Sequence, residues 1–186
     1  MNVGIDISNI ELKTERLLLR PFRQSDLDDF FEYASVDGVG QMAGWVPHKN
    51  KEESQKILDL FINEKKTFAV VNNGKVIGSI GIEKYNEKQY PEFDEKKARE
   101  LGYVLSKEYW GSGLMPEAAK EVIRYLFDDV GLDLLFCSHF IENNQSKRVI
   151  EKLGFTYYKD TERETPLGMN KMCKEYILYR HEYERD

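Results

Sequence analysis

The sequence predicts a single α/β domain in which helices and strands are mixed within one sheet. Three observations support this fold class. Strand-like and helix-like segments alternate in the order strand, two helices, three strands, helix, strand, helix, two strands. The length of 186 residues is most simply that of one domain, covering 1–186. The composition, with 41% hydrophobic and 32% charged residues, is typical of a globular protein.

The first predicted elements are a strand and two helices. Residues 16–22 form a short apolar run that is ended by proline, as strands often are. Ser25 or Asp26 then caps a helix, because the apolar residues after them have helical spacing. A second helix is predicted for residues 51–64 on the same grounds.

A β-hairpin follows, with strands at residues 67–71 and 76–83. These strands are joined by Asn72-Asn73-Gly74, and Asn-Gly at such a place is a strong signal for a tight turn. The polar segment 86–97 is interpreted as a solvated loop, with contact to a substrate or a second subunit as the alternative. The next strand is predicted for residues 99–105.

The second half continues the mixture of helices and strands. Its predicted elements are a helix at 116–128, a strand at 134–141, a short helix ending at Leu153, and strands at 155–163 and 171–179. Gly131 and Gly154 end the two helices, and Asn143 begins a run that caps the second one. A turn at 166–168 joins the last two strands.

Charge and composition exclude several classes of function. The net charge of −6 argues against nucleic acid as the main partner. The chain has no apolar run long enough to span a membrane and no signal-peptide pattern, which predicts a cytoplasmic protein. Its two cysteines lack CxxC spacing and its three histidines are not clustered, so we expect no metal site.

A turn with two glycines, Trp110-Gly111-Ser112-Gly113-Leu114-Met115, lies between a predicted strand and a predicted helix. Such a turn can direct several backbone N–H groups at an anion in front of the positive end of a helix. No GxxxxGK[ST] string exists. Residues 38–43 match a GxGxxA fingerprint but lack a preceding strand. The alternative for residues 110–115 is a plain tight turn.

Three motifs in a fixed order carry a resemblance to a known family. They are Glu100-Leu101-Gly102-Tyr103-Val104-Leu105, Tyr109-Trp110-Gly111-Ser112-Gly113 with Glu117-Ala118, and Asn143-x-x-Ser146 followed by Glu151-Lys152-Leu153-Gly154-Phe155. The sequence resembles the GNAT superfamily of acyl-coenzyme A N-acyltransferases, and within it the RimJ/RimL-like branch. The resemblance implies a single-domain GNAT fold, with a mixed, mostly antiparallel sheet, a splayed central strand pair and helices on both faces.

The resemblance also implies acetyl-coenzyme A as co-substrate. Its pantetheine arm is then expected along the backbone near Val104 and Leu105, and its pyrophosphate on the loop amides. The cofactor-binding residues implied in this way are Val104, Leu105, Trp110, Gly111, Ser112, Gly113, Leu114, Met115, Asn143 and Ser146. Gly or Ala is usual at the position of Met115, whose larger side chain could crowd the last amide.

The chemistry requires a neutral amine, and therefore a base. Glu100 is the first candidate, with exposure to solvent or pairing to Arg99 or a lysine as the alternative. His139 and Glu142 come next, with a structural role as the alternative for His139. A tyrosine that often serves as general acid in the family aligns with Ile150 here. The resemblance points to Ser146 for that role, with helix capping as its alternative.

The predicted function is transfer of acetyl to a primary amine by direct attack in a ternary complex. A protein N-terminal α-amine is the expected acceptor within the RimJ/RimL-like branch, and a homodimer is possible. The residues expected to line the acceptor pocket are Trp45, His48, Tyr33 and His139. Two alternatives remain: a small amine as acceptor (polyamine, amino acid or aminoglycoside), and a non-catalytic acyl-coenzyme A-binding module.

Overall fold

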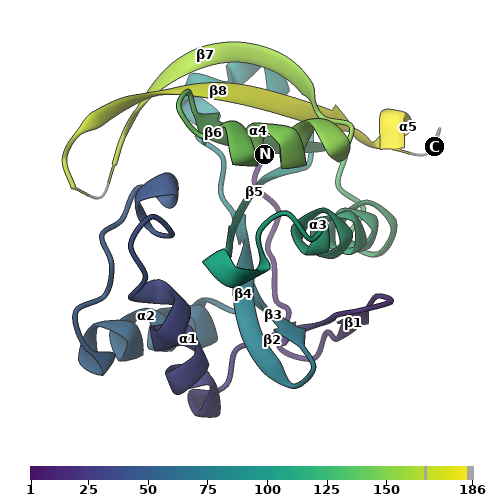
Figure 1. Ribbon diagram of the computed structural model, residues 1–186. Coiled ribbons are helices and arrows are strands. Elements are labelled where there is room, and N and C mark those ends of the chain that lie inside the picture. The colour runs from purple at the N-terminus through teal and green to yellow at the C-terminus, as the bar shows by residue number, and fades with distance from the viewer. Residues whose placement is uncertain (166, 184–186) are drawn as a thin grey trace. The chain divides into compact units, whose positions relative to one another are not determined.

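The strands form a mixed sheet, in which neighbouring strands follow the order β1-β2-β3-β4-β5-β6-β8-β7 (Figure 1). The computed structural model describes residues 1–165 and 167–183. The strands are β1 Leu12–Lys13, β2 Leu18–Pro21, β3 Thr67–Asn72, β4 Lys75–Glu83, β5 Ala98–Leu105, β6 Leu134–Phe140, β7 Thr156–Glu164 and β8 Asn170–Tyr179. The helices are α1 Leu27–Ala34, α2 Lys51–Glu64, α3 Leu114–Arg124, α4 Asn144–Lys152 and α5 Arg180–Tyr183.

The chain is divided into two compact units. The N-terminal unit consists of residues 5–81 and 103–121, and the C-terminal unit of residues 1–4, 82–102 and the chain from residue 122 onward. Strands β4 and β5 each run through both units, as does helix α3. No linker in the sequence marks the boundary, since each unit is assembled from separate segments of the chain.

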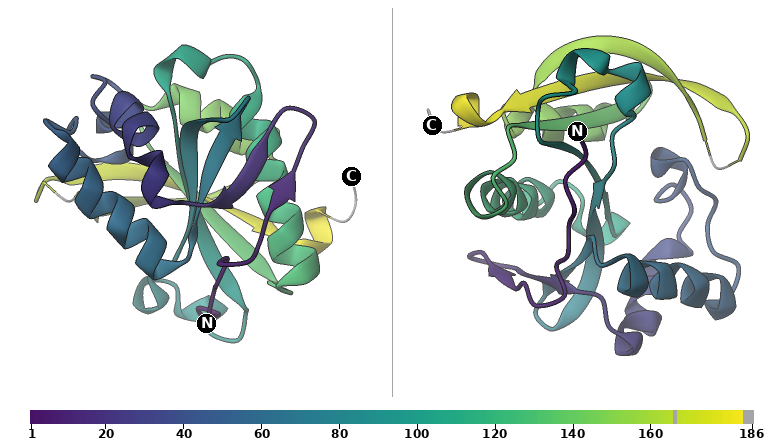
Figure 2. Two further views of the ribbon diagram at one scale, coloured as in Figure 1. Left: turned by 90° about the horizontal axis from the view of Figure 1, so that it is seen from below. Right: turned by 180° about the vertical axis from the view of Figure 1, so that it is seen from behind.

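The core of the N-terminal unit lies between antiparallel strands β2, β3 and β4 and the helices α1 and α2. Both views of Figure 2 show α1 and α2 side by side. Phe22, Phe30 and Leu58 are buried at their contact, where the apolar stripes of both helices meet the strands. Burying three such side chains contributes about 2 kcal/mol each to the free energy of folding.

The hairpin between β3 and β4 has the predicted turn. Asn73 and Gly74 both have positive φ angles, of 48° and 81°. This pair of angles suits the twist of a two-residue hairpin, and Asn and Gly are the residues that adopt it most readily. The prediction of a hairpin at this place is confirmed.

The start of α1 differs from the prediction. Asp26 does not cap the helix with its side chain, and neither does Ser25. The Asp26 carboxylate is instead buried, where it accepts both guanidinium hydrogen bonds of Arg20 at 2.8 Å and the backbone N–H of Arg23. The carboxylate thus pairs with the buried Arg20 and caps the backbone at the start of the 3₁₀ turn Gln24–Asp26, instead of the first turn of α1.

In the C-terminal unit, β5 pairs with β6 in parallel, whereas β6 pairs with β8 and β8 with β7 in antiparallel orientation. The parallel register runs from Ala98↔Leu134 to Leu101↔Cys137, and β8 lies between β6 and β7. Figure 1 shows β7 and β8 as a long hairpin. The mixed, mostly antiparallel sheet agrees with the predicted fold class.

The segment 86–97 is exposed at most positions, as its polar composition predicted, but two of its aromatic residues are buried. Tyr90 and Phe93 are 1% and 7% exposed, and they pack with Tyr85 around Phe136 of β6. The segment contains two short 3₁₀ turns, Glu87–Gln89 and Pro91–Phe93, between which the aromatic side chains turn inward. Aromatic residues at irregular spacing gave no periodic signal in the sequence.

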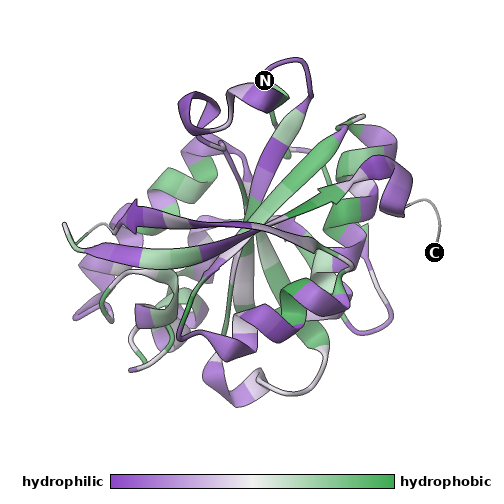
Figure 3. Cartoon of the chain, turned by 90° about the horizontal axis from the view of Figure 1, so that it is seen from above, coloured by the Kyte–Doolittle hydropathy of each residue, from purple (hydrophilic) through white to green (hydrophobic). Residues whose placement is uncertain are grey.

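Helix α3 begins two residues before its predicted start and continues as a π-helical segment, Tyr125–Asp129. Its predicted stripe is buried, with Ala118, Ala119, Val122 and Ile123 at most 1% exposed. Figure 3 shows the corresponding alternation of hydrophobic and hydrophilic residues along the helices. The short elements β1 and α5 were not predicted, and Pro166 of the predicted 166–168 turn lies outside the described residues.

Candidate active site

The glycine loop, which we define as Trp110–Met115, lies in the N-terminal unit directly before and at the start of α3. Gly111 and Gly113 have φ angles of 75° and 77°. Residues with a Cβ atom rarely adopt this left-handed backbone conformation, so the loop needs glycine at both positions. Residues 111–113 are exposed. The two glycines thus shape an open turn at a helix N-terminus.

The backbone N–H groups of this loop are free to bind a ligand. In the part of the chain that the structure describes, the amides of Gly111 to Met115 donate to no protein acceptor. Pro116 has no N–H, and the amide of Glu117 already donates to the carbonyl of Gly113 at 3.2 Å. Consecutive free amides at the positive end of a helix are the donor set that a phosphate group requires.

The larger side chains of the loop turn away from this surface. Leu114 and Met115 are 5% and 4% exposed, so the methionine that might have crowded the last amide is held in the protein interior. The Trp110 indole packs against the core of the N-terminal unit, and its Nε1 donates to the Leu105 carbonyl at 2.8 Å. This bond ties the loop to the end of β5.

The end of β5 lies unusually close to β4. A Cβ atom at Gly78 would be only 2.4 Å from the carbonyl oxygen of Val104, so only glycine fits there. Just beyond, the amide of Ser106 donates to the Ile77 carbonyl at 2.7 Å. Val104 and Leu105, the predicted pantetheine-binding residues, are thus fixed at their β4 side.

A charged cluster, Glu100, Arg163 and Glu175, lies in the C-terminal unit on strands β5, β7 and β8. Arg163 Nη1 is 2.7 Å from Glu100 Oε1, and its Nη2 is 2.7 Å from Glu175 Oε1. The side chains of Glu100, Arg163 and Glu175 are 12%, 32% and 0% exposed. Sequence reasoning paired Glu100 with Arg99 or solvent, but Arg99 donates to the Val3 carbonyl instead.

The two oxygens of Glu100 have different surroundings. Oε1 accepts hydrogen bonds from Arg163 and, at 3.3 Å, from the hydroxyl of Ser138. Oε2 makes no hydrogen bond to any residue that the structure describes. The carboxylate is therefore held in place by one oxygen while the other can accept a proton or an ammonium group.

Glu175 is the most deeply buried member of the cluster. Its Oε1 accepts from Thr161 and Arg163, whereas its Oε2 and the hydroxyl of Tyr90 have no hydrogen-bond partner among the described residues. Burial raises the pKa of Glu175 above its ordinary value, and Arg163 acts against this rise. Burial and the charge of Glu175 raise the pKa of Tyr90, which keeps its phenol protonated.

The other candidates in the C-terminal unit are engaged in internal bonds. Both ring nitrogens of His139 have partners, the Phe140 carbonyl at 2.7 Å and the Tyr176 hydroxyl at 3.4 Å, and the residue is 4% exposed. Asn143 accepts the amide of Ser146 with its side-chain oxygen and so caps α4. Capping, the alternative considered for Ser146, is thus performed by Asn143.

One cysteine and one glutamate of this unit, Cys137 and Glu142, also carry groups that can act as a nucleophile or a base. Cys137 is 1% exposed, its thiol lies 3.4 Å from the Leu101 carbonyl, and burial raises its pKa, so it remains a neutral thiol. Glu142 pairs with Lys171 at 2.8 Å, and this hydrogen bond lowers its pKa. Neither environment suits a nucleophile or a general base.

The predicted acceptor residues Trp45, His48 and Tyr33 all lie in the N-terminal unit. The rings of Trp45 and His48 are 5.1 Å apart, and Trp45 packs so closely on Gly40 that a Cβ there would be 2.2 Å from the indole. His48 Nδ1 is 2.7 Å from the Ser54 hydroxyl, and burial lowers its pKa. Tyr33 is 3% exposed within the core cluster.

The Gly38–Ala43 segment, which matched a dinucleotide fingerprint in letters, lies between α1 and α2 and contains only a 3₁₀ turn, Gln41–Ala43. It therefore has neither the strand nor the helix that such a site needs. Gly40 serves instead as the contact point for Trp45.

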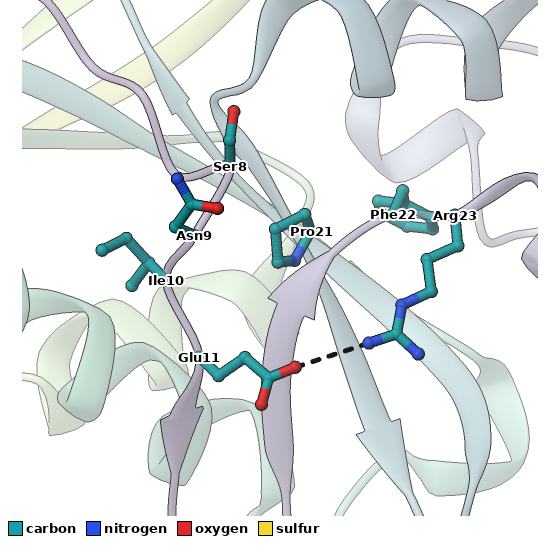
Figure 4. A pocket seen from close by; sticks show the side chains of 7 residues that line it. All are labelled: Ser8, Asn9, Ile10, Glu11, Pro21, Phe22 and Arg23. Carbon is teal, nitrogen blue, oxygen red and sulfur yellow. Dashed lines mark hydrogen bonds and ion pairs between the residues drawn. The ribbon is translucent and has the colours of Figure 1, made fainter.

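A surface hollow of about 440 Å³ also lies in the N-terminal unit, lined by Ser8–Glu11 and Pro21–Arg23 (Figure 4). None of the predicted site residues lines it, and Glu11 and Arg23 form an exposed ion pair at its edge. Among the described residues, no group of His, Cys, Asp and Glu side chains is arranged to hold a metal ion, and no helix is long and apolar enough to cross a membrane.

The family follows from a comparison with known domains. A family model described as "Acetyltransferase (GNAT) domain" matches residues 16–156, which include both glycines of the loop, Glu100 and Ser146. The chain belongs to the GNAT acetyltransferase family. It is therefore an acyl-coenzyme A-dependent N-acyltransferase, and the free amides of the glycine loop fit the phosphates of such a co-substrate.

Relatives in sequence and structure agree with this family. An uncharacterized N-acetyltransferase of Bacillus subtilis, YoaA, is 28% identical over 151 residues, which cover 77% of this chain and 81% of YoaA. The crystal structure of a GNAT-family acetyltransferase from Bacillus anthracis matches with a TM-score of 0.79 and 23% identity, covering 92% of this chain and 99% of that one. The predicted GNAT fold is confirmed.

Two further solved structures with a similar fold are named for different biological roles. A putative ribosomal-protein-serine acetyltransferase from Vibrio cholerae matches with a TM-score of 0.76 and 19% identity, covering 92% of this chain and 98% of that one. The microcin C7 self-immunity acetyltransferase MccE, in complex with acetyl-CoA and AMP, matches with a TM-score of 0.75 and 15% identity, covering 89% of this chain and 93% of that one. At these identities the likeness concerns the fold alone.

Sequence reasoning missed two residues of the charged cluster, Arg163 and Glu175. Glu175 had a detectable signal, because it occupies the same strand face as Cys173 and Ile177, both of which are buried. A glutamate at an apolar register position indicates a buried, paired charge. Arg163 had no such signal, since its partner Glu100 is 63 residues away in sequence.

Proposed function

We propose that this N-acetyltransferase acts on the α-amine of a protein N-terminus and that it belongs with the RimJ/RimL-like branch of its family. The observation that carries the proposal is the carboxylate of Glu100, which is anchored through Oε1 and open at Oε2. In the cytoplasm, which we propose as its location, the buried Cys137 and Cys173 would stay reduced.

The glycine loop has the role of binding the co-substrate. When bound, acetyl-coenzyme A supplies an activated thioester acyl group. The amides of Gly111 to Met115 bind its pyrophosphate in this proposal, because they are free, consecutive and placed at the positive end of α3. Val104 and Leu105 offer backbone groups to the pantetheine arm.

Glu100 has the role of general base. An ammonium group must lose a proton before it can attack, and Oε2 is the oxygen that can accept this proton. The hydrogen bonds from Arg163 and Ser138 to Oε1 fix the orientation of the carboxylate, so that little reorganisation accompanies proton transfer.

The two classes of amine differ in how much they need a base. Deprotonating an α-amine of pKa about 8 at pH 7 costs roughly 1 to 1.5 kcal/mol, whereas a lysine of pKa about 10.4 costs roughly 4 to 5 kcal/mol. An α-amine is therefore the acceptor that a single carboxylate can serve more easily.

Trp45 and His48 are the residues that we carry forward for the acceptor pocket, because they form an aromatic pair that is only partly buried. Tyr33 and His139 are enclosed by protein and would need an opening to reach a substrate. Ser146 stays a predicted acid on the resemblance alone. A small-molecule amine is the competing acceptor.

The test is acetylation by the purified chain of four acceptors at pH 7: a peptide with a free N-terminus, the same peptide with a blocked N-terminus and a lysine, spermidine, and an aminoglycoside. Release of coenzyme A thiol reports turnover. We expect kcat/KM for the free N-terminus to exceed that for the blocked lysine peptide by at least about a hundredfold. Equal rates on the two peptides, or a preference for spermidine or the aminoglycoside, would overturn the assignment of the acceptor.

A further inference from the structure

The turn between β1 and β2 is joined to the first turn of α3 by one glutamate. Glu117 Oε1 accepts from the Thr14 hydroxyl at 2.6 Å and from the Arg16 amide at 2.9 Å, and Oε2 accepts from Arg16 Nε at 2.7 Å. Both oxygens of Glu117 are thus occupied. The connection spans 101 residues of sequence and lies entirely within the N-terminal unit.

These bonds fix the guanidinium of Arg16 beside the glycine loop. Its Nε is held by Glu117 and its Nη1 donates to the Ser112 carbonyl at 3.0 Å. The third nitrogen, Nη2, makes no hydrogen bond to a described residue, and it would lie 3.6 Å from a Cβ at Gly113. The side chain is 45% exposed, so this nitrogen is accessible to a ligand on the loop.

We propose that Arg16 is a phosphate-binding residue of the coenzyme A site, donating from Nη2 to a phosphoryl oxygen that the amides of the glycine loop also hold. The inference rests on the proposed role of the glycine loop and adds to it a side chain from outside the loop. The ligand class is the pyrophosphate or phosphomonoester of the nucleotide part of coenzyme A.

The arrangement suits a phosphate for two reasons. A guanidinium donates charge-assisted hydrogen bonds that are shorter and stronger than those of neutral amides. Arg16 is also held in place before a ligand arrives, so little side-chain entropy is lost on binding. The absence of a side chain at Gly113 keeps the space between Nη2 and the loop amides open.

The competing explanation is that Arg16 only clasps the loop to the β1–β2 turn. In that case Glu117 would matter as much as Arg16, because each supplies half of the ion pair. The two explanations therefore differ in how the variants Arg16→Gln and Glu117→Gln compare. Arg23→Gln is a matched control, since Arg23 is an exposed arginine of the same unit whose partner is Glu11 at 3.4 Å.

The experiment measures the Kd of coenzyme A by calorimetry for the full chain and the three variants, together with the Kd of acetyl-pantetheine, which has no phosphate. We expect Arg16→Gln to weaken coenzyme A binding about tenfold and to leave acetyl-pantetheine binding unchanged. Glu117→Gln keeps the guanidinium and should cost at most about threefold, and Arg23→Gln should have no effect. Circular dichroism checks that the variants are folded.

Equal losses of coenzyme A affinity in Arg16→Gln and Glu117→Gln would overturn the inference in favour of a clasp. Unchanged affinity in Arg16→Gln would also overturn it, as would an equal loss for acetyl-pantetheine. A wild-type chain that binds no coenzyme A would instead overturn the proposed role of the loop. The two failures are thus distinguishable.

Discussion

The glycine loop and the charged cluster use different parts of the chain to prepare for an ion. The loop, at Trp110–Met115, presents backbone amides on an exposed turn and carries no charged side chain of its own. The cluster of Glu100, Arg163 and Glu175 consists of charged side chains, one of them fully buried, on three strands. Both are held by bonds between residues far apart in sequence.

The difference shows what each region requires from the rest of the protein. Free amides on a surface turn remain hydrated, so the loop costs little until a ligand binds. Buried carboxylates lose hydration, so the cluster is stable only while Arg163 offsets the two negative charges. Changes in the loop should therefore affect affinity, whereas changes in the cluster should affect stability or turnover.

The largest effect is expected for Arg163→Met. This change leaves Glu175 buried without its cation, which should lower the free energy of unfolding by about 3 kcal/mol. Urea denaturation at pH 7 measures this loss. Adding Glu175→Gln should restore part of it, because the unpaired charge is then gone.

Arg23→Met, which breaks an exposed pair, should change stability by no more than about 0.5 kcal/mol. If Arg163→Met lowered the free energy of unfolding by less than about 1 kcal/mol, the charged cluster would not depend on Arg163 for its stability.

Glu100→Gln tests the catalytic side of the cluster. The amide can still accept from Arg163 and Ser138 but cannot take a proton, so we expect kcat to fall about a hundredfold. The Kd of coenzyme A, measured by calorimetry, should stay within about twofold because Glu100 is not part of the loop. Full turnover in this variant would remove Glu100 from the mechanism.

Gly113→Glu tests the loop. The φ angle of 77° is strained for any side chain, and the new carboxylate repels a phosphate, so coenzyme A affinity should fall at least about tenfold. Gly74→Glu is the matched control. Its φ angle is 81°, it lies in the same unit and it adds the same charge in the β3–β4 turn. If both variants lose the same affinity, backbone strain or net charge is responsible and the loop assignment fails.

The smallest effects are the pH dependences of two glutamates, which should have opposite signs. Burial acts to raise the pKa of Glu117, but hydrogen bonds from Thr14 and Arg16 outweigh it and lower the pKa. Its stabilisation is therefore present above the unfolded pKa and lost as pH falls. The pKa of Glu175 is raised by burial, so its contribution is present at low pH and lost as pH rises through the folded pKa.

Urea titrations of the wild type and of the Glu117→Gln and Glu175→Gln variants at pH values from 4 to 8 can test this pair of signs. The stability deficit of Glu117→Gln should shrink toward acid pH, whereas that of Glu175→Gln should grow. Deficits that change in the same direction would show that the two carboxylates are not in opposite environments.

Local sequence signals predicted most of the helices, strands and turns, because each signal lies within the same short segment of sequence as the element that it specifies. The apolar spacing of residues 51–64 gave α2 its bounds, and Asn73-Gly74 gave the β3–β4 turn. The two loop glycines predicted a turn, which their positive φ angles confirm, whereas the binding of an anion there stays a prediction. In segment 86–97, which is exposed elsewhere, the burial of Tyr90 and Phe93 was not predicted, because their contact with Phe136 is long-range and no local pattern encodes it.

The sequence by itself determined the fold class, the family resemblance and the place of the glycine loop, since these depend on periodicity and on backbone conformations that only glycine adopts readily. The tertiary structure alone decided the partners of the charged groups. Glu100 pairs with Arg163, Asp26 with Arg20, and Arg16 with Glu117. The physical reason is that a charge takes the partner that the folded backbone brings within about 3 Å, and sequence distance carries no information about that partner.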